Sequence, residues 1–533
     1  MVAAPKNSAS RATVKPVAMP SPGSRYLHLL LFFLLFTIPF IALHFGLLNL
    51  PYFWDEQGQF VPTALDLLRN GSWVAHSVVP NIHPPGVELY LVLWYKVFGY
   101  SIVITRFAML LVAGAGLLAL FLLSIELCRG VPGLPAFLPP VLLLLSPLFF
   151  MQGMMAQLDM PAMTLALVAL LLFIRKRFAA SALVCVALVL VKETGAVTAL
   201  ALFCVLLWKR QFKFASYYLG VPVALGAWLM LLHHKTGYWT GDPGFAQYNI
   251  WYSLQPVHVL TSFLRHLFYL FFAEFRWIGT VLILLLRKRL WAYRSFDWAV
   301  TGLVCAANFL LVTLLGGAAL ERYLLPVLPV FYIVVTIALW QLPKLPRLAI
   351  GTALSAGLIC SLFWNPPYPF PFENNYAMVD FVELQEAASY YIQHRLPGAR
   401  IATAWPYTAG LRDPDFGFVD RPQKVIETND FHFDSIKAIP RDKYDALVVY
   451  TRTWAPGGGI LSFPPVREFL SKFYGYEPEI TRAQCASLGL QLEASWERRG
   501  QVITIYVRMR SRNHMPASEN SASGDHAAIA AGS

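Results

Sequence analysis

The chain has 533 residues, of which 57% are hydrophobic and only 14% are charged. Soluble domains carry about 25% charged residues, so the composition excludes an ordinary soluble protein and indicates a polytopic membrane protein. The formal net charge is +12, but the basic residues fall in short clusters between apolar runs, as orientation signals do. No basic surface with interleaved aromatic residues stands apart from them, so we expect no nucleic-acid partner.

The N-terminal segment combines a polar tail with the first apolar run. Residues 1–25 are rich in Pro, Ser and Ala and contain scattered basic residues, which predicts a disordered cytoplasmic tail. The apolar run from Tyr26 to Leu50 is too long for the core of a signal peptide and lacks a small-residue cleavage site. We interpret it as a retained signal anchor and as the first membrane span.

Further apolar runs continue to residue 364. They lie at about 102–127, 134–150, 160–174, 178–191, 196–208, 214–232, 267–286, 298–315, 323–340 and 348–364. Basic clusters fall in alternate connections, as is typical of the cytoplasmic side. These clusters lie at 129, 175–177, 209–213, 287–294 and 344–347. An even number of spans then separates each pair of clusters, which predicts about eleven transmembrane helices with the N-terminus cytoplasmic and the C-terminus outside.

The predicted outer loops hold charged residues of both signs. These residues are Asp55, Glu56, His83, Asp159, Lys192, Glu193, Glu321 and Arg322. Charges that converge on one membrane face indicate an active site more than a channel, because the spans themselves are nearly free of charge. The exceptions are Arg106, Glu274 and Arg276. The last two are two residues apart, so on a helix they would not face each other.

The stretch from Tyr52 to Gly86 is central to the predicted chemistry. Glycosyl transfer needs a base that removes a proton from the acceptor, and positive charge or hydrogen bonds that stabilise the departing phosphate. Asp55 is the candidate base, while Glu56 is a candidate to bind substrate hydroxyls or to orient Asp55. The apolar spacing from Gln59 to Arg69 predicts a helix along the membrane surface, which would hold both acids at the level of the lipid headgroups.

Each charged residue also has a simpler interpretation, which the local sequence leaves open. Asp55 and Glu56 can merely begin a surface helix, and Asp159, which lies just before Pro161, can be a helix N-cap. His83 can be an ordinary loop residue, and Lys192 with Glu193 can form a hairpin tip. Arg322 can be an anchor at the membrane interface.

Several motifs resemble those of the GT-C glycosyltransferases. They are the acidic pair after the first span, the HPPG segment from His83 that leads to Tyr90 and Arg106, LDMP at 158–161, and ERYLLPVLP at 321–329. Among these enzymes, the sequence resembles the bacterial protein O-mannosyltransferase and lipid A aminoarabinose transferase family, over roughly residues 26–340. The order of the motifs and their common membrane face make the resemblance specific.

The resemblance implies Asp55 as the catalytic base and Asp159 as a second essential acid. It implies an inverting transfer from a polyprenyl-phosphate sugar to a lipid, glycan or protein acceptor of the cell envelope, outside a bacterial plasma membrane. Some relatives use a divalent metal, and no clear extra ligand set is present, so the cofactor stays open. The residues expected to bind substrate are Glu56, His83, Lys192, Glu193, Arg322 and Tyr323.

From Asn365 the composition changes. The Pro-rich residues 365–369 predict an extended linker, and residues 365–511 predict a small extracytoplasmic α/β domain, followed by a disordered tail at 512–533. Cys485 is the only cysteine in this part, so no disulfide is available within it, and Gly457 to Gly459 lack the lysine of a P-loop. We expect helices at 377–396 and 466–473, and strands at 400–404, 424–427, 446–450 and 501–508.

The sequence therefore predicts a mainly α polytopic membrane protein with a transmembrane glycosyltransferase domain at 26–364 and a C-terminal extracytoplasmic α/β domain. A transporter or flippase of lipid-linked saccharides is the alternative; it should place polar groups or broken helices near the membrane midplane, often in repeated halves. A third interpretation is a structural assembly protein, in which Asp55 and Asp159 would be dispensable.

Overall fold

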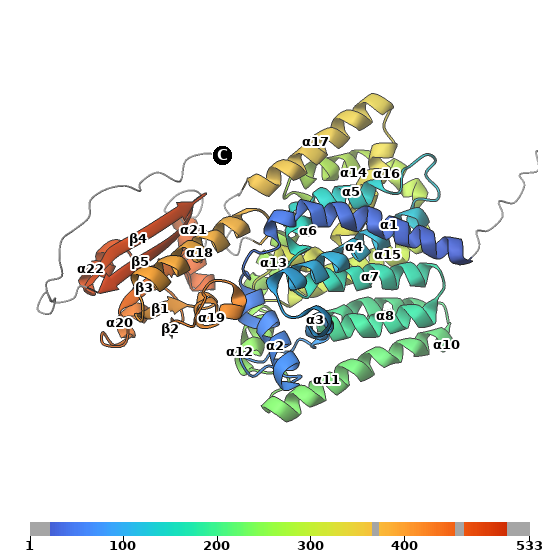
Figure 1. Cartoon of the computed structure of the whole chain (residues 1–533). Helices are drawn as coiled ribbons and strands as arrows, with labels where there is room; N and C mark the ends of the chain where they lie inside the picture. The colour runs from blue at the N-terminus through green and yellow to red at the C-terminus, as the bar shows by residue number, and fades with distance from the viewer. Residues whose placement is uncertain (1–21, 365–372, 453–462, 509–533) are drawn as a thin grey trace, which may run out of the picture.

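The computed structural model describes residues 22–364, 373–452 and 463–508 (Figure 1). The predicted linker at 365–369, the glycine run at 457–459 and the predicted tail at 512–533 lie outside the described residues, as does most of the predicted N-terminal tail. The described chain is mainly helical, and a small sheet follows the helical bundle along the sequence.

Apolar helices form the bundle, and each predicted apolar run contains at least part of one. They are α1 (Pro22–Leu43), α4 (Ile102–Leu127), α5 (Leu138–Leu145), α6 (Pro147–Gln152), α7 (Asp159–Ile174), α8 (Phe178–Val191), α9 (Ala196–Trp208), α10 (Phe212–Ala215), α11 (Gly220–Thr236), α13 (Pro256–Phe271), α14 (Arg276–Leu290), α15 (Phe296–Leu314), α16 (Leu328–Trp340) and α17 (Lys344–Phe363). By length and composition, five helices of the described chain could cross a membrane, or six if the bent pair α13–α14 is one span. The count of about eleven spans and their orientation stay predictions.

Glycines bring the helices around α4 close together. A Cβ atom on Gly114 would collide with the side chain of Thr37 on α1, and one on Gly116 would collide with Thr164 on α7. Small residues of this kind let helix backbones approach closely where lipid removes the usual hydrophobic drive for association. The α4 helix is therefore packed on two sides, and 67% of an apolar 18-residue stretch of this helix is buried inside the protein.

The predicted run at 267–286 is not one straight helix. The α13 and α14 helices meet there at 87°, and Glu274 and Phe275 in the bend have φ angles of 52° and 61°. Because the chain is not helical at this point, Arg276 Nη1 can lie 2.5 Å from Glu274 Oε2. The prediction that Glu274 and Arg276 do not face each other is therefore wrong, since it assumed a regular helix.

The acidic stretch forms a turn and a helix, as the apolar spacing predicted. A π-helical turn, η2 (Glu56–Phe60), leads into α2 (Val61–Asn70), and Gly71 ends α2 with a φ angle of 67°. The prediction missed α3 (Gly86–Phe98), α12 (Pro243–Ala246) and the π-turn η5 (Gln247–Tyr252). The α3 helix follows the HPPG segment, where Pro85 occupies the N-cap position.

Five strands of the described chain form one sheet in the C-terminal unit, in the order β2-β1-β3-β5-β4. The strands are β1 (Arg400–Ala404), β2 (Lys424–Thr428), β3 (Ala446–Tyr450), β4 (Leu490–Arg498) and β5 (Gln501–Arg508). The β1 strand pairs in parallel with β2 and β3, whereas β5 pairs antiparallel with β3 and β4. The four predicted strands are confirmed. The prediction missed β4, whose sequence is mostly polar and exposed.

Helices flank this sheet. The two that the sequence predicted are confirmed as α18 (Ala377–Arg395) and α21 (Pro464–Tyr474). The others are the short helices α19 (Tyr407–Arg412), α20 (Phe433–Ala438) and α22 (Arg482–Ser487). The α18 helix contacts β4 and β5, and its Tyr391 packs edge-to-face on Trp496 of β4, which fixes the sheet to the segment leaving the helical bundle.

The C-terminal unit docks on the acidic stretch, where α19 contacts η2 (Figure 1). Phe381 on α18 packs edge-to-face on Phe53 with 5.6 Å between ring centroids. Trp405, which follows β1, packs edge-to-face on Trp54 at the same centroid distance of 5.6 Å. Its indole also lies against Gly58, where a Cβ atom would collide with the ring. The C-terminal unit therefore forms a wall beside the acidic pair.

Gly58→Ala should destabilise the protein by about 1–3 kcal/mol, because the new methyl group overpacks the contact with Trp405. Thermal unfolding of the purified protein in detergent would measure this loss. Gly46→Ala is the matched control, since nothing lies within 4 Å of a Cβ atom built there. Equal unfolding temperatures for the two variants would contradict the close packing of Trp405 on this turn.

Candidate active site

A cavity of about 1180 Å³ lies where the helical bundle meets the C-terminal unit. Side chains of α9, α11 and α15 form its apolar wall, and Trp405 and Tyr474 of the C-terminal unit also line it. Its polar end contains Asp55, His83, Asp159, Lys192, Glu193, Arg322 and Tyr323. All the predicted site residues except Glu56 are thus brought to one cavity. A large apolar cavity with a few convergent polar groups is the usual form of a ligand site.

Arg322, in the 3₁₀ turn η7 (Glu321–Leu324), is the centre of the polar end. Its Nη2 donates to Asp55 Oδ2 at 2.5 Å, and its Nη1 donates to Glu373 Oε2 and Gln157 Oε1, each at 2.5 Å. Its Nε lies 3.1 Å from Asp159 Oδ2, an ion pair without hydrogen-bond geometry. The planar guanidinium therefore joins three carboxylates. Arg322 is also buried, which does not fit the alternative of an anchor at the membrane interface.

Lys192 and Tyr323 complete this cluster on the other side of Asp159. Lys192 Nζ lies 2.5 Å from Asp159 Oδ1 and 4.6 Å from the centroid of the Tyr323 ring. Asp159 is the first residue of α7, where the helix dipole favours a negative charge. Its carboxylate is bound by cations and does not cap the helix, because Leu158 occupies the N-cap position.

His83 and Glu193 form a second pair at the polar end. His83 Nδ1 lies 2.8 Å from Glu193 Oε2. The histidine comes from the loop before α3, and the glutamate from the 3₁₀ turn η3 (Glu193–Gly195) between α8 and α9. The pair therefore ties together two loops that are far apart in sequence, and its side chains stay mostly buried in the cavity wall.

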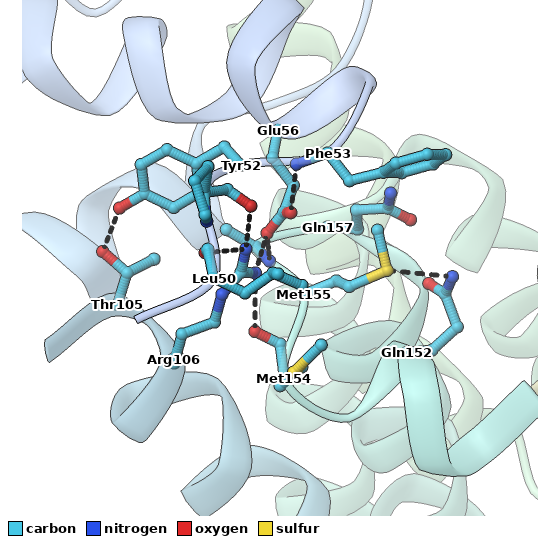
Figure 2. A network of polar contacts seen from close by, with 12 residues as sticks. Leu50, Tyr52, Phe53, Glu56, Thr105, Arg106, Gln152, Met154, Met155 and Gln157 are labelled. Carbon is cyan, nitrogen blue, oxygen red and sulfur yellow. Dashed lines mark hydrogen bonds and ion pairs between the residues drawn. The ribbon is translucent and has the colours of Figure 1, made fainter. Parts of the chain in front are cut away.

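Glu56 does not line the cavity, which corrects its predicted role in binding substrate hydroxyls. Figure 2 shows its carboxylate beside Arg106, with which it forms a fully buried ion pair. Its Oε1 also accepts a hydrogen bond from the backbone N–H of Ala156 at 2.6 Å, and its Oε2 accepts one from that of Phe53 at 2.9 Å. Arg106 also donates to the carbonyl groups of Leu50, Pro51 and Met154. The pair fastens the acidic stretch to α4.

Sequence reasoning missed two charged residues of this region, Glu373 and Arg265. Arg265 lines the cavity and donates from Nε to Tyr269 Oη at 2.6 Å. The sequence could have indicated Arg265, because this basic residue lies on the predicted outer side, whereas most basic residues of membrane proteins lie on the cytoplasmic side. Glu373 follows the predicted linker and gave no comparable signal. Burial raises the pKa of Glu373 to about 7, because the loss of solvation outweighs the charge of Arg322.

No group of three or more His, Cys, Asp or Glu side chains is placed to hold a metal ion within residues 22–364, 373–452 and 463–508. The carboxylates of the polar end are instead bound to the cations Lys192 and Arg322 and to His83. The described part of the chain therefore offers no set of ligands for the divalent metal that the sequence left open.

No family model matches the sequence, and no curated protein sequence matches it. The structure of ArnT from Cupriavidus metallidurans bound to undecaprenyl phosphate is similar, with a TM-score of 0.53 at 12% identity over 91% of this chain and 98% of that one. The apo state gives 0.52 at 14% identity over 88% and 97%. The chain has the fold of this ArnT. A more distant likeness, AglB from Archaeoglobus fulgidus, has a TM-score of 0.47 at 11% identity over 80% and 70%, and adds nothing to this conclusion.

The shared fold includes the C-terminal sheet, because the alignment with ArnT spans nearly all of both chains. The fold and the apolar helices make the chain an integral membrane protein. This agrees with the predicted mainly α class and with the resemblance seen in the motifs. The roles of individual residues rest on the geometry of the cavity.

Proposed function

We propose that this chain is a membrane glycosyltransferase that moves a sugar from a polyprenyl-phosphate donor to an envelope acceptor on the extracytoplasmic face. One observation supports this most: a single cavity joins an apolar chamber to a cluster of carboxylates and cations. A polyprenyl phosphate has the matching chemistry, with an apolar chain and a charged head. ArnT, whose fold is similar, has been solved bound to undecaprenyl phosphate.

Asp55 is the proposed base. Its side chain is 16% exposed, against 6% for Asp159 and 2% for Glu373, so it is the most accessible of the three carboxylates around Arg322. The acceptor oxygen or nitrogen attacks the anomeric carbon while Asp55 takes the acceptor proton. The bond from that carbon to the phosphate oxygen breaks, and its electron pair leaves with the polyprenyl phosphate. A single displacement of this kind inverts the anomeric carbon.

Asp159 orients the cations beside the base in this proposal. Its two carboxylate oxygens lie close to Lys192 Nζ and Arg322 Nε, so it fixes both positive charges. Cations that are already in place stabilise charge on the leaving phosphate without reorganisation at the moment of reaction. Its essential role would then be positioning, in contrast to the proton transfer at Asp55.

Arg265 is the cation to which we assign binding of the donor phosphate before the transfer step, in which Lys192 and Arg322 act. Lys192 and Arg322 each pair with carboxylates, whereas no carboxylate in the described part of the chain lies within ion-pair distance of Arg265. Arg265→Ala should raise the KM for the donor roughly 10- to 150-fold, the worth of a charge-assisted hydrogen bond, with little change in kcat. Arg265→Lys should retain part of the affinity. Steady-state kinetics with varied donor concentration would measure both, and unchanged donor kinetics would remove Arg265 from the site.

The proposed orientation makes its own prediction. A reporter enzyme fused after Asn365 should be active outside the cytoplasm, and one fused after Arg177 should be active inside, because basic loops stay cytoplasmic. Paired alkaline phosphatase and β-galactosidase fusions would measure this. The reverse pattern would put Asp55 and Asp159 on the cytoplasmic side and would contradict an extracytoplasmic reaction.

Mass spectrometry of envelope lipids and glycans tests the proposed function in cells. Cells that carry the wild-type gene should contain a species heavier by one sugar residue, which should be missing when the gene is deleted or encodes Asp55→Asn. The mass difference identifies the sugar, and fragmentation identifies the acceptor. Identical envelope profiles in all three strains, with the protein present in the membrane, would contradict the proposal.

A further inference from the structure

Glu373 is buried beside the proposed catalytic cluster, although it belongs to the segment that enters the C-terminal unit. Its Oε2 accepts a hydrogen bond from Arg322 Nη1 at 2.5 Å and lies 3.4 Å from Gln157 Nε2. Its Oε1 is buried, with no hydrogen-bond partner in the described part of the chain. The next residue, Asn374, donates to Glu321 Oε2 at 2.6 Å. Two consecutive residues of this segment therefore hold two consecutive residues of η7.

The cluster contains more carboxylates than cations. Asp55, Asp159 and Glu373 contact Arg322, and Lys192 supplies the second positive charge. With all of them ionised, two cations against three carboxylates leave a net charge of 2 − 3 = −1. A lipid donor in the cavity would exclude water from the surroundings of this excess charge. Even if another cation matched its phosphate, the unbalanced charge would become more unfavourable.

Glu373 is the carboxylate best placed to lose its charge. It is the least exposed of the three, and its Oε1 can hold a proton without breaking a contact to Arg322. Burial already brings its pKa to about 7, so a small further loss of solvation protonates it near neutral pH. The charged and titratable groups that act on it are Asp55, Asp159, Tyr269, Arg322 and Tyr323.

We propose, on the basis of the function proposed above, that Glu373 is a positioning residue that takes up a proton from solvent when the anionic lipid-phosphate donor binds. As an anion it holds Arg322 next to Asp55 and Asp159. As a neutral acid it still accepts the hydrogen bond from Arg322 through its carbonyl oxygen, and the excess negative charge is removed. Donor binding is then coupled to pH through the segment that leads into the C-terminal unit.

Calorimetric titration of the full-length protein in nanodiscs tests this coupling. The probe is the methyl ester of undecaprenyl phosphate, a phosphodiester that does not titrate near neutral pH, unlike a phosphate monoester. Titrations near pH 7 in buffers of different ionisation enthalpy report the protons bound with each lipid. We expect an uptake of roughly half a proton per lipid, because a group with a pKa near the ambient pH is about half protonated beforehand. The affinity for the lipid should fall as the pH rises, so the Kd should increase.

Glu373→Gln keeps an oxygen acceptor for Arg322 but cannot titrate, so its proton uptake should vanish and its Kd should no longer depend on pH. Glu479→Gln is the matched control, because Glu479 lies outside the cavity and burial also raises its pKa to about 7. This control should keep the wild-type uptake.

Lipid binding by the wild type without proton uptake would overturn the inference, even if the variants did not fold. Equal uptake by Glu373→Gln and the wild type would also overturn it. Failure of the wild type to bind the lipid would overturn the donor of the proposed function together with this inference. Turnover of a lipid-linked sugar without coupled uptake would leave the proposed function intact and remove the inference alone.

Discussion

Asp55→Asn should lower sugar transfer by about 10²–10⁴-fold, the usual contribution of a positioned proton transfer. The amide keeps the size of the carboxyl and an oxygen that can accept from Arg322, but it cannot take a proton near neutral pH. Donor binding should not weaken, because the lost interaction is made mainly in the transition state and the substitution removes one negative charge from the cluster. Turnover of a defined polyprenyl-phosphate sugar by the purified, folded variant would measure the effect.

Asp415→Asn is the control for this substitution. Asp415 also lies near the acidic stretch, but it pairs with Arg69 at a site outside the cavity. An exposed pair of this kind contributes at most about 1 kcal/mol to stability, and we expect normal turnover. Near wild-type turnover in Asp55→Asn would exclude Asp55 as the base and would direct attention to Asp159, the other acid of the polar end.

The neighbouring substitution Glu56→Ala should act on folding. Removing one partner of a fully buried ion pair leaves an uncompensated charge on Arg106 and should destabilise the protein by about 3–5 kcal/mol. It also removes the acceptor of the Phe53 and Ala156 amides. Thermal unfolding and expression level would measure the loss, whereas Asp55→Asn should unfold like the wild type. A Glu56→Ala protein that is stable but inactive would contradict the structural role and restore the predicted contact with substrate.

Much of the candidate site could be predicted from the sequence, because the order of the membrane spans determines which charged loops lie on the same face. Asp55, Asp159, Lys192 and Arg322 lie in separate loops, yet alternating spans would bring those loops to one face. That argument needs only the order of apolar and basic segments, and the cavity contains all four residues. The order of segments predicts which residues lie on the same membrane face but not which of them contact one another. The joining of three carboxylates by Arg322 could therefore not be predicted.

Side-chain direction could not be predicted either. Asp55 and Glu56 are adjacent in sequence, but the π-turn that begins at Glu56 separates them: Asp55 lines the cavity, and Glu56 pairs with Arg106. The α13–α14 bend depends on two residues with positive φ angles, which no local pattern marked. Glu373 reaches the cluster only because the C-terminal unit docks on the helical bundle, and that contact is a property of the complete fold.

A structure of this protein with a bound undecaprenyl phosphodiester would test the proposed donor site directly. The phosphate should contact Arg265, the polyprenyl chain should lie along the apolar wall formed by α9, α11 and α15, and the ester carbon should be beside Asp55. Cryo-electron microscopy of the protein in nanodiscs with this lipid would give that arrangement. A lipid bound elsewhere on the helical bundle, with its phosphate remote from Asp55 and Arg265, would contradict the proposed donor site and the role of Asp55 as the base.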